Sequence, residues 1–266
     1  MSSSKSHSRR PWWSALGIYA GLSLAAFIMV MPLLFSFVTA FKSPQDFASH
    51  SPFALPSPPS LASFQAILTG RVNFGDAIIT TLLMVVVMVV GQLVSSVLAA
   101  YAFARIEFPG REFIFWLFLG TMMIPASVLV IPLYLMMAKM GLNNTFWGIV
   151  LPFVFASPYA VFLLRQSFRQ IPQEIIDAAT MDGAGQMRIL FSIVVPVSKP
   201  IISTLVLITV VSQWNSFMWP RIIAATRPRV LTVATAALQS QYNANWTYVM
   251  AATTIALVPL IALFIV

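Results

Sequence analysis

The 266-residue sequence contains no cysteine, and only 8% of its residues are charged. The absence of cysteine excludes a disulfide framework, a thiol nucleophile and a metal site with thiolate ligands. A soluble domain carries about a quarter charged residues, whereas 59% of this sequence is hydrophobic and its mean hydropathy is +0.88. We therefore predict an integral membrane protein rather than a soluble globular one.

Short motifs that mark common catalytic sites are also missing. The sequence has no GxxxxGKS or GxxxxGKT loop for nucleotide phosphates, no HExxH, no CxxC and no GxSxG. We therefore predict no catalytic residue, no metal site and no ATP hydrolysis in this chain. Its two histidines, His7 and His50, lie in separate polar segments. The net charge of +8 comes from basic residues scattered between apolar runs, which favours membrane lipid over nucleic acid as a partner.

Six segments are long and apolar enough to cross a membrane as helices, and none contains a charged residue. The lack of acids in the spans argues against a proton-coupled or sodium-coupled carrier. Residues 42–76 are polar and rich in proline, so we predict that they lie outside the membrane. We predict an all-α polytopic protein with an N-terminal segment at 1–12 and a single transmembrane domain at 13–266. The predicted spans are 11–41, 77–104, 113–138, 145–164, 200–220 and 247–266.

The N-terminus is polar and basic before the first apolar run begins. A secretory signal peptide is the alternative, because residues 38–40 resemble a cleavage site. The apolar run exceeds the roughly 7 to 15 residues of a signal-peptide core, so we predict a retained membrane helix. The basic residues then place the N-terminus in the cytoplasm; they are Lys5, Arg9 and Arg10.

Proline and uncharged polar residues lie inside several predicted spans. Pro125 and Pro132 interrupt the third span, and Pro152 and Pro158 interrupt the fourth. Prolines at membrane depth are compatible with tightly packed kinked helices and with a water-lined path. Polar residues of the fifth span suit either interhelical hydrogen bonding or a translocation path. The candidates for such a path are Gln213, Trp214 and Asn215.

A polar stretch at 168–200 separates the fourth and fifth predicted spans. Pro172 fits the first turn of a helix, and Gly183 fits the left-handed residue just past a helix end. We therefore predict a short helix at 172–182, on the cytoplasmic side of the membrane. Three of the seven acidic residues of the chain belong to it: Glu174, Asp177 and Asp182.

The predicted helix has features of a docking element. Glu174 and Asp177 lie near its N-terminus, where the helix dipole favours negative charge. Ala178 and Ala179 are small enough to let another surface come close. On helical spacing, Ala179 shares an apolar face with two isoleucines and Gly183.

The run from Glu174 to Ala184, EIIDAATMDGA, resembles the EAA loop of permease subunits of bacterial ATP-binding-cassette importers. Asp177 stands where that pattern has a glutamate before the two alanines, and it keeps the charge. Other stretches resemble the carbohydrate-uptake branch, in particular the smaller maltose-transporter permease, so that nearly the whole chain is covered. These stretches are Phe41-Lys42-Ser43, AAYAFAR at 99–105, FPGR at 108–111, Ile124-Pro125, IPLY at 131–134 and Trp214-Asn215.

The resemblance implies a subunit of an ATP-driven importer of a sugar or sugar-like solute in the bacterial cytoplasmic (inner) membrane. Its partners would be a second related permease in a heterodimer, two cytoplasmic ATPase subunits that bind ATP and Mg, and an extracytoplasmic solute-binding protein. No cofactor is expected in this chain. A non-sugar solute such as a polyol phosphate, and a stand-alone secondary carrier, are the alternatives.

In that family the helix at 172–182 would be the coupling helix, which contacts an ATPase subunit. Members usually continue past the last span into a short glycine-containing cytoplasmic tail, whereas this sequence ends at Val266. The resemblance assigns ATPase coupling to seven positions: Glu174, Asp177, Ala178, Ala179, Asp182, Gly183 and Ala184.

Overall fold

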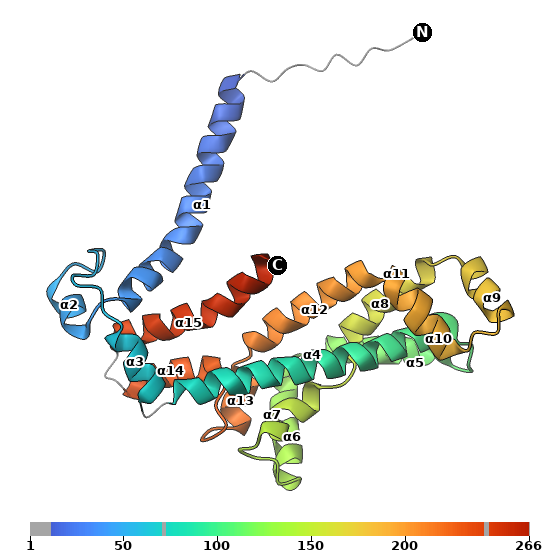
Figure 1. Ribbon diagram of the computed structural model, residues 1–266. Coiled ribbons are helices and arrows are strands. Elements are labelled where there is room, and N and C mark those ends of the chain that lie inside the picture. Colours follow the sequence, from blue (N-terminus) through green and yellow to red (C-terminus); the bar gives the residue numbers. More distant parts are fainter. Residues whose placement is uncertain (1–11, 71–72, 242–244, 266) are drawn as a thin grey trace. The chain divides into compact units, whose positions relative to one another are not determined.

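A computed structural model describes the chain except residues 1–11, 71–72, 242–244 and 266. Within the described residues every regular element is a helix and none is a strand (Figure 1), which confirms the predicted all-α class. Three helices are long and apolar enough to cross a membrane alone, and up to six spans result if each of three bent helix pairs counts as one. The elements, which include the 3-10 segments η1 and η2 and the π-helical segment η3, are α1 (Trp12–Ala40), α2 (Pro44–Ser49), α3 (Ala62–Thr69), α4 (Phe74–Arg105), α5 (Arg111–Gly120), η1 (Thr121–Met123), α6 (Ala126–Lys139), α7 (Phe146–Val150), η2 (Leu151–Phe153), α8 (Pro158–Gln170), α9 (Gln173–Met181), α10 (Gln186–Ile189), η3 (Leu190–Val194), α11 (Val195–Val197), α12 (Lys199–Trp214), α13 (Met218–Ile223), α14 (Leu231–Gln241) and α15 (Trp246–Ile265).

The chain divides into two compact units, Met1–Gly70 with Leu238–Pro259, and Arg71–Ala237 with Leu260–Val266. In the first unit, α1 matches the first predicted span. Most side chains described on α1 are exposed, so its apolar surface is available to lipid or to another subunit. The basic residues behind the predicted orientation lie outside the described residues: Lys5, Arg9 and Arg10.

The proline-rich segment after α1 folds around a buried lysine. Lys42 is 0% exposed, and its Nζ donates hydrogen bonds to the carbonyl oxygens of Ser51 and Pro52, both at 3.1 Å. The hydroxyl oxygen of Ser63 lies within hydrogen-bond distance of the carbonyl oxygen of Lys42, at 3.3 Å, and of Oγ1 of Thr247, at 3.1 Å. The segment therefore forms short helices and turns, and the prediction that it is no membrane span is confirmed.

In the second unit, α8 and α12 pack along α4. The 32 residues of α4 extend about 48 Å at 1.5 Å per residue, which exceeds the roughly 30 Å of a bilayer hydrocarbon core. Gly91 lets α4 approach the segment that follows η2, because a Cβ at this glycine would lie 2.5 Å from the carbonyl oxygen of Val154. α4 is therefore longer than a bilayer core is thick, and its middle is tightly packed.

The third and fourth predicted spans are broken rather than continuous. The helical axis bends by 99° between η1 and α6, and by 41° between η2 and α8. Pro125 immediately precedes α6, and Ile124 before it is extended, because proline disfavours a helical residue before it. Pro158 is the first residue of α8, where its missing N–H costs nothing. Pro132 lies inside α6 without ending it.

The fifth predicted span, 200–220, is wrong at its C-terminal end. α12 ends at Trp214, and a break separates it from α13. Nε1 of Trp219 donates to the carbonyl oxygens of Gly148 and Ile149, both at 3.2 Å. This contact holds α13 against α7, so the chain turns away from the axis of α12.

The segment before α12 is more helical than predicted. α10, η3 and α11 form one helical run that is bent by 80° from α12. The π-helical turn η3 directly precedes Pro196 in α11, and a proline removes one backbone hydrogen bond from a helix. The second and sixth predicted spans match α4 and α15 closely.

Candidate functional site

The short helix predicted between the fourth and fifth spans is α9, and its bounds agree with the prediction to within one residue. Pro172 is the N-cap and Asp182 the C-cap. Gly183 has a φ of +82°. Its N–H donates to the carbonyl of Thr180, and the N–H of Ala184 donates to the carbonyl of Ala179, both at 3.0 Å. This pair of bonds is the Schellman motif, which ends a helix with a sharp turn.

One face of α9 holds the helix to the rest of the second unit. Ile176 is buried, and Ala179 and Ala184 pack against the same hydrophobic cluster, which includes Phe168 and Ile189. The opposite face is exposed. It presents four of the seven predicted coupling residues: Glu174, Asp177, Ala178 and Asp182.

Two large apolar side chains lie on this exposed face: Met181 was missed by the sequence analysis, and the prediction that Ile175 shares the packed apolar face with Ile176 and Ala179 is wrong. Met181 is 88% exposed and Ile175 is 46% exposed. Exposed apolar side chains beside carboxylates are typical of a protein interface rather than of a solvated loop. The signal in the sequence was the presence of large apolar residues between charged ones in a polar stretch.

A buried arginine holds the helix that leads into α9. Arg165 of α8 is 2% exposed, and its guanidinium forms an ion pair with Glu112 of α5. Its Nε donates to the carbonyl of Phe103 at 3.1 Å, and its Cζ lies 3.8 Å from the ring centroid of Phe115. Burying a guanidinium requires such compensation, so this contact set fixes α8 against α4 and α5.

A polar hollow lies between α4, the connection from η2 to α8, and α12. Its volume is about 400 Å³. Nε2 of Gln92 donates to the carbonyl of Phe153 at 2.5 Å. The polar and aromatic side chains that line the hollow are Gln92, Phe153, Phe155, Ser157, Tyr159, Thr209, Ser212 and Gln213. None of its lining residues is charged.

The three predicted path residues have different positions. Gln213 lines the hollow. Trp214 is only 4% exposed. Asn215 is the C-cap of α12, and its Nδ2 donates to the carbonyl of Val211 at 2.8 Å. Tyr159 in the hollow was missed, because a tyrosine just after a proline gave no sign of facing a cavity.

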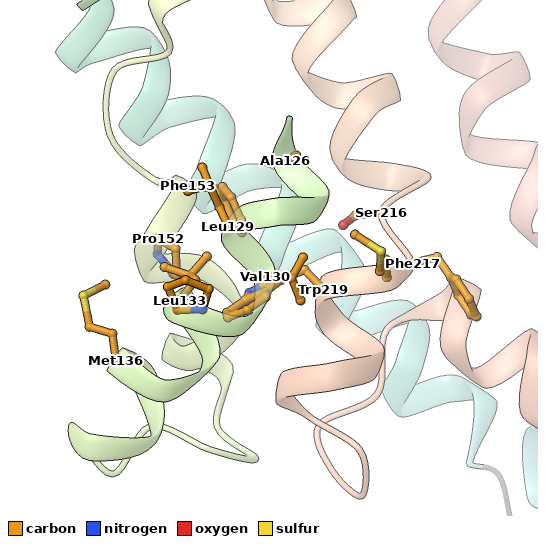
Figure 2. Close-up of a pocket in the computed structure, with 12 residues that line it drawn as sticks. Ala126, Leu129, Val130, Leu133, Met136, Pro152, Phe153, Ser216, Phe217 and Trp219 are labelled. Atoms are coloured by element: carbon orange, nitrogen blue, oxygen red, sulfur yellow. The ribbon is translucent and has the colours of Figure 1, made fainter. Parts of the chain in front are cut away.

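A second, apolar pocket is also lined by Pro152 and Phe153 of η2, and it has a volume of about 590 Å³. Figure 2 shows Leu129 and Leu133 of α6 on one side, and Phe217 and Trp219 on the other. Ser216 supplies the only hydroxyl among its lining residues. This lining suits an apolar occupant rather than a hydrated solute. Among the described residues, no three His, Cys, Asp or Glu side chains are grouped to hold a metal ion.

Apolar helices, a polar hollow between them and one exposed loop helix define a polytopic membrane protein of the transport type. The chain belongs to the family described as binding-protein-dependent transport system inner membrane component, which it matches over residues 92–266. This membership confirms the predicted importer-permease family, in which the chain acts as a transporter component rather than as an enzyme.

Curated relatives extend the match over nearly the whole chain. The arabinooligosaccharides transport system permease protein AraQ of Halalkalibacterium halodurans is 32% identical, over 92% of this chain and 88% of the relative. The sn-glycerol-3-phosphate transport system permease protein UgpE of Yersinia pestis is 32% identical, over 90% and 87%. The diacetylchitobiose uptake system permease protein NgcG of Streptomyces coelicolor is 30% identical, over 93% and 83%.

Two solved structures share the fold. A chain from a bacterial ABC transporter involved in the import of the acidic polysaccharide alginate superposes with a TM-score of 0.83 at 23% identity, over 98% of this chain and 97% of that one. A chain from a bacterial alginate ABC transporter in complex with an alginate pentasaccharide-bound periplasmic protein gives a TM-score of 0.67 at 14% identity, over 96% and 92%. These similarities confirm the helical permease fold.

Proposed function

We propose that this chain is the membrane-spanning subunit of an ATP-driven importer for a neutral sugar or sugar-like solute, and that α9 is its coupling helix. The subunit would form half of the translocation path and pair with a second related permease. Two cytoplasmic ATPase subunits would bind ATP and Mg, and an extracytoplasmic solute-binding protein would deliver the solute. The N-terminal segment 1–12, the loop 168–200 and the ATPase subunits would lie on the cytoplasmic side of a single transmembrane domain, 13–266.

The exposed face of α9 is the observation that carries this proposal. Its inner face is buried by Ile176, while Ile175, Met181 and the carboxylates point away from the protein core. A short helix whose two faces are both suited to contact can bind a partner without leaving its own subunit. The Schellman turn at Gly183 fixes the direction in which the chain leaves the helix. ATPase closure would then displace α9 as a rigid element.

The lining of the hollow supports a neutral solute. Aromatic faces, amides and hydroxyls bind the apolar faces and hydroxyl groups of sugars. A polyol phosphate would need a cation or a cluster of donors at its phosphate, and no lysine or arginine lines the hollow. Arabinooligosaccharide and diacetylchitobiose permeases among the relatives fit a saccharide, while the sn-glycerol-3-phosphate permease keeps the polyol phosphate as the alternative.

Reconstitution with the partner permease, the ATPase subunits and the binding protein tests the proposal. We expect ATP-dependent uptake of a neutral oligosaccharide by these proteoliposomes and no uptake of sn-glycerol-3-phosphate. Uptake of the phosphate alone would overturn the neutral-solute assignment. Solute movement by the purified chain without ATPase subunits would instead identify a stand-alone secondary carrier.

A further inference from the structure

The last residue of α4 contacts the entry to the coupling helix. Nη2 of Arg105 donates to the carbonyl oxygens of Phe168 and Ile171, both at 2.5 Å, and its Nη1 donates to Oε1 of Gln173 at 2.6 Å. Phe168 belongs to the last turn of α8, and Gln173 begins α9. The carbonyl of Phe168 also accepts from the N–H of the C-cap residue Ile171 at 3.4 Å, so the guanidinium of Arg105 adds a second hydrogen bond there and complements the helix dipole.

The exit from the coupling helix is held by the same face of α4. Tyr101 is 3% exposed, and its hydroxyl donates to Oε1 of Gln186 at 2.7 Å. Gln186 is the first residue of α10. Tyr101 and Arg105 are four residues apart, so they project from one side of α4. The two side chains therefore form hydrogen bonds with residues on both sides of α9, Gln173 at its start and Gln186 after its end.

These hydrogen bonds constrain the position and orientation of α9 more strictly than its apolar packing does. Ile176 and Ala179 pack into the core, but apolar contact is non-directional and permits sliding. A planar guanidinium on two carbonyls and a side-chain amide fixes both distance and angle. Movement of α9 that draws Gln173 or Gln186 away from α4 would have to stretch the bonds at Arg105 or Tyr101, or carry α4 with it.

The same helix reaches the polar hollow. Gln92 lies thirteen residues before Arg105 on α4, which corresponds to about 20 Å along the helix. Gln92 lines the hollow and contacts the carbonyl of Phe153. A continuous helix without an internal proline therefore joins the coupling loop to the wall of the hollow.

We propose that Arg105 and Tyr101 are positioning residues that make α4 and the coupling helix move as one body, so that displacement of α9 is transmitted to the hollow through α4. This assignment rests on the proposed function, because it requires that α9 receive the motion of an ATPase subunit. In this assignment both residues act through α9 and α4, not by touching the ATPase or the solute. Their effect is on how much solute moves for each ATP hydrolysed.

Distance measurements between labels test the one-body prediction directly. The native chain has no cysteine, so cysteines can be introduced without background at Met181 on α9 and at Ile79 near the far end of α4, both of which are exposed. In the assembled complex we expect the distance between spin labels at these positions to stay the same with and without ATP. A distance that changes with ATP in the otherwise native chain would overturn the proposal.

Substitutions in the same complex supply the second measurement. Tyr101→Phe removes one hydroxyl, and Arg105→Lys keeps the charge but loses the planar fork. We expect each to lower the solute moved per ATP about fivefold, which corresponds to roughly 1 kcal/mol, and to make the label distance depend on ATP. Arg169→Ala is the matched control for the loss of a nearby arginine. Arg169 pairs with Glu112 of α5 at 3.3 Å, and its side chain is 43% exposed, so its loss should leave uptake per ATP unchanged. Equal uptake per ATP in the native chain and in both substituted chains would overturn the proposal.

Cross-linking separates this inference from the proposed function. A cysteine at Met181 should cross-link to the ATPase subunit in the native, Tyr101→Phe and Arg105→Lys backgrounds alike. Loss of the cross-link in the native background would reject α9 as the coupling helix. Retained cross-linking with unchanged uptake per ATP in both variants would reject only the role of Arg105 and Tyr101.

Discussion

The proposed coupling helix and the polar hollow, both in the second unit, are built in opposite ways. α9 is defined by residues adjacent in sequence, from its N-cap Pro172 to the left-handed Gly183. The hollow is formed by α4, the segment around Pro158 and α12, which are far apart along the chain. A local structure depends on turn chemistry, whereas a hollow between distant helices depends on how closely those helices pack. Substitutions should therefore act on α9 through backbone conformation and on the hollow through the packing of its helices.

The largest effect is expected where close packing forms the hollow. In Gly91→Ala, the new methyl group would lie 2.4 Å from Cγ2 and 2.5 Å from the carbonyl oxygen of Val154. Because a backbone oxygen cannot rotate aside, α4 and the segment that follows η2 must separate, and overpacking of this kind costs about 1–3 kcal/mol. We expect a lower midpoint of thermal unfolding in detergent and at least about a tenfold loss of assembled complex.

The matched control for this variant is Gly120→Ala at the end of α5. A Cβ at Gly120 meets no atom within 4 Å, and alanine is favoured over glycine in a helix by about 1 kcal/mol. The unfolding midpoint of Gly120→Ala should stay the same or rise. Equal midpoints for the two variants would contradict the close approach of α4 to Val154.

The second-largest effect is expected on the coupling of ATP hydrolysis to solute uptake, without an effect on folding. Gly183→Val places a β-branched residue at a φ of +82°, where the left-handed conformation costs roughly 1–2 kcal/mol. A Cβ there meets no atom within 4 Å, so folding and assembly should be retained. We expect ATP-driven uptake to fall about tenfold, the factor that corresponds to this energy, while ATP hydrolysis continues.

Gly185→Val tests whether backbone conformation is the cause. Gly185 is two residues further along, and a Cβ there also meets no atom within 4 Å. Its φ of −72° and ψ of 161° suit valine. Normal substrate-stimulated ATP hydrolysis and transport in Gly183→Val, or an equal loss in both variants, would refute this explanation.

The difference between structure set by adjacent residues and structure set by distant ones also decides what could be predicted from the sequence. The loop helix was predicted to within one residue at each end, because its limits depend on Pro172 and Gly183 themselves. Long uncharged runs likewise predicted α1, α4 and α15. These features need no knowledge of distant residues.

The breaks in the remaining spans could not be predicted with the same certainty. Pro125 breaks its span by 99°, whereas Pro132 lies inside α6; the two prolines look alike in sequence, and tertiary packing decides between them. The end of α12 at Trp214 depends on the contact of Trp219 with α7. Residues that bond across the fold, such as Arg105 and Tyr101, carried no local signal for their partners.

A smaller effect is expected from the polar lining of the hollow. Gln213→Ala removes an amide that faces the hollow, and a lost hydrogen bond to solute costs about 1 kcal/mol, or roughly fivefold. Uptake of a neutral oligosaccharide at saturating binding protein should fall by this factor, without a change in the unfolding midpoint. Gln166→Ala on the exposed side of α8 is the control. A full rate of uptake in Gln213→Ala would remove this side chain from the path.

The smallest effect is expected at the exposed C-terminal end of α9, the proposed coupling helix. Met181 is 88% exposed, so Met181→Ser should change the free energy of unfolding by less than about 0.5 kcal/mol. Complete burial of a methionine is worth about 1.5–3 kcal/mol. If the ATPase buries Met181 only in part, removal of this side chain should weaken ATPase binding about threefold. Met123→Ser, which is 86% exposed on η1, is the control for the loss of an exposed methionine. Equal ATPase affinity in both variants would show that the coupling surface is carried by the carboxylates and Ile175 rather than by Met181.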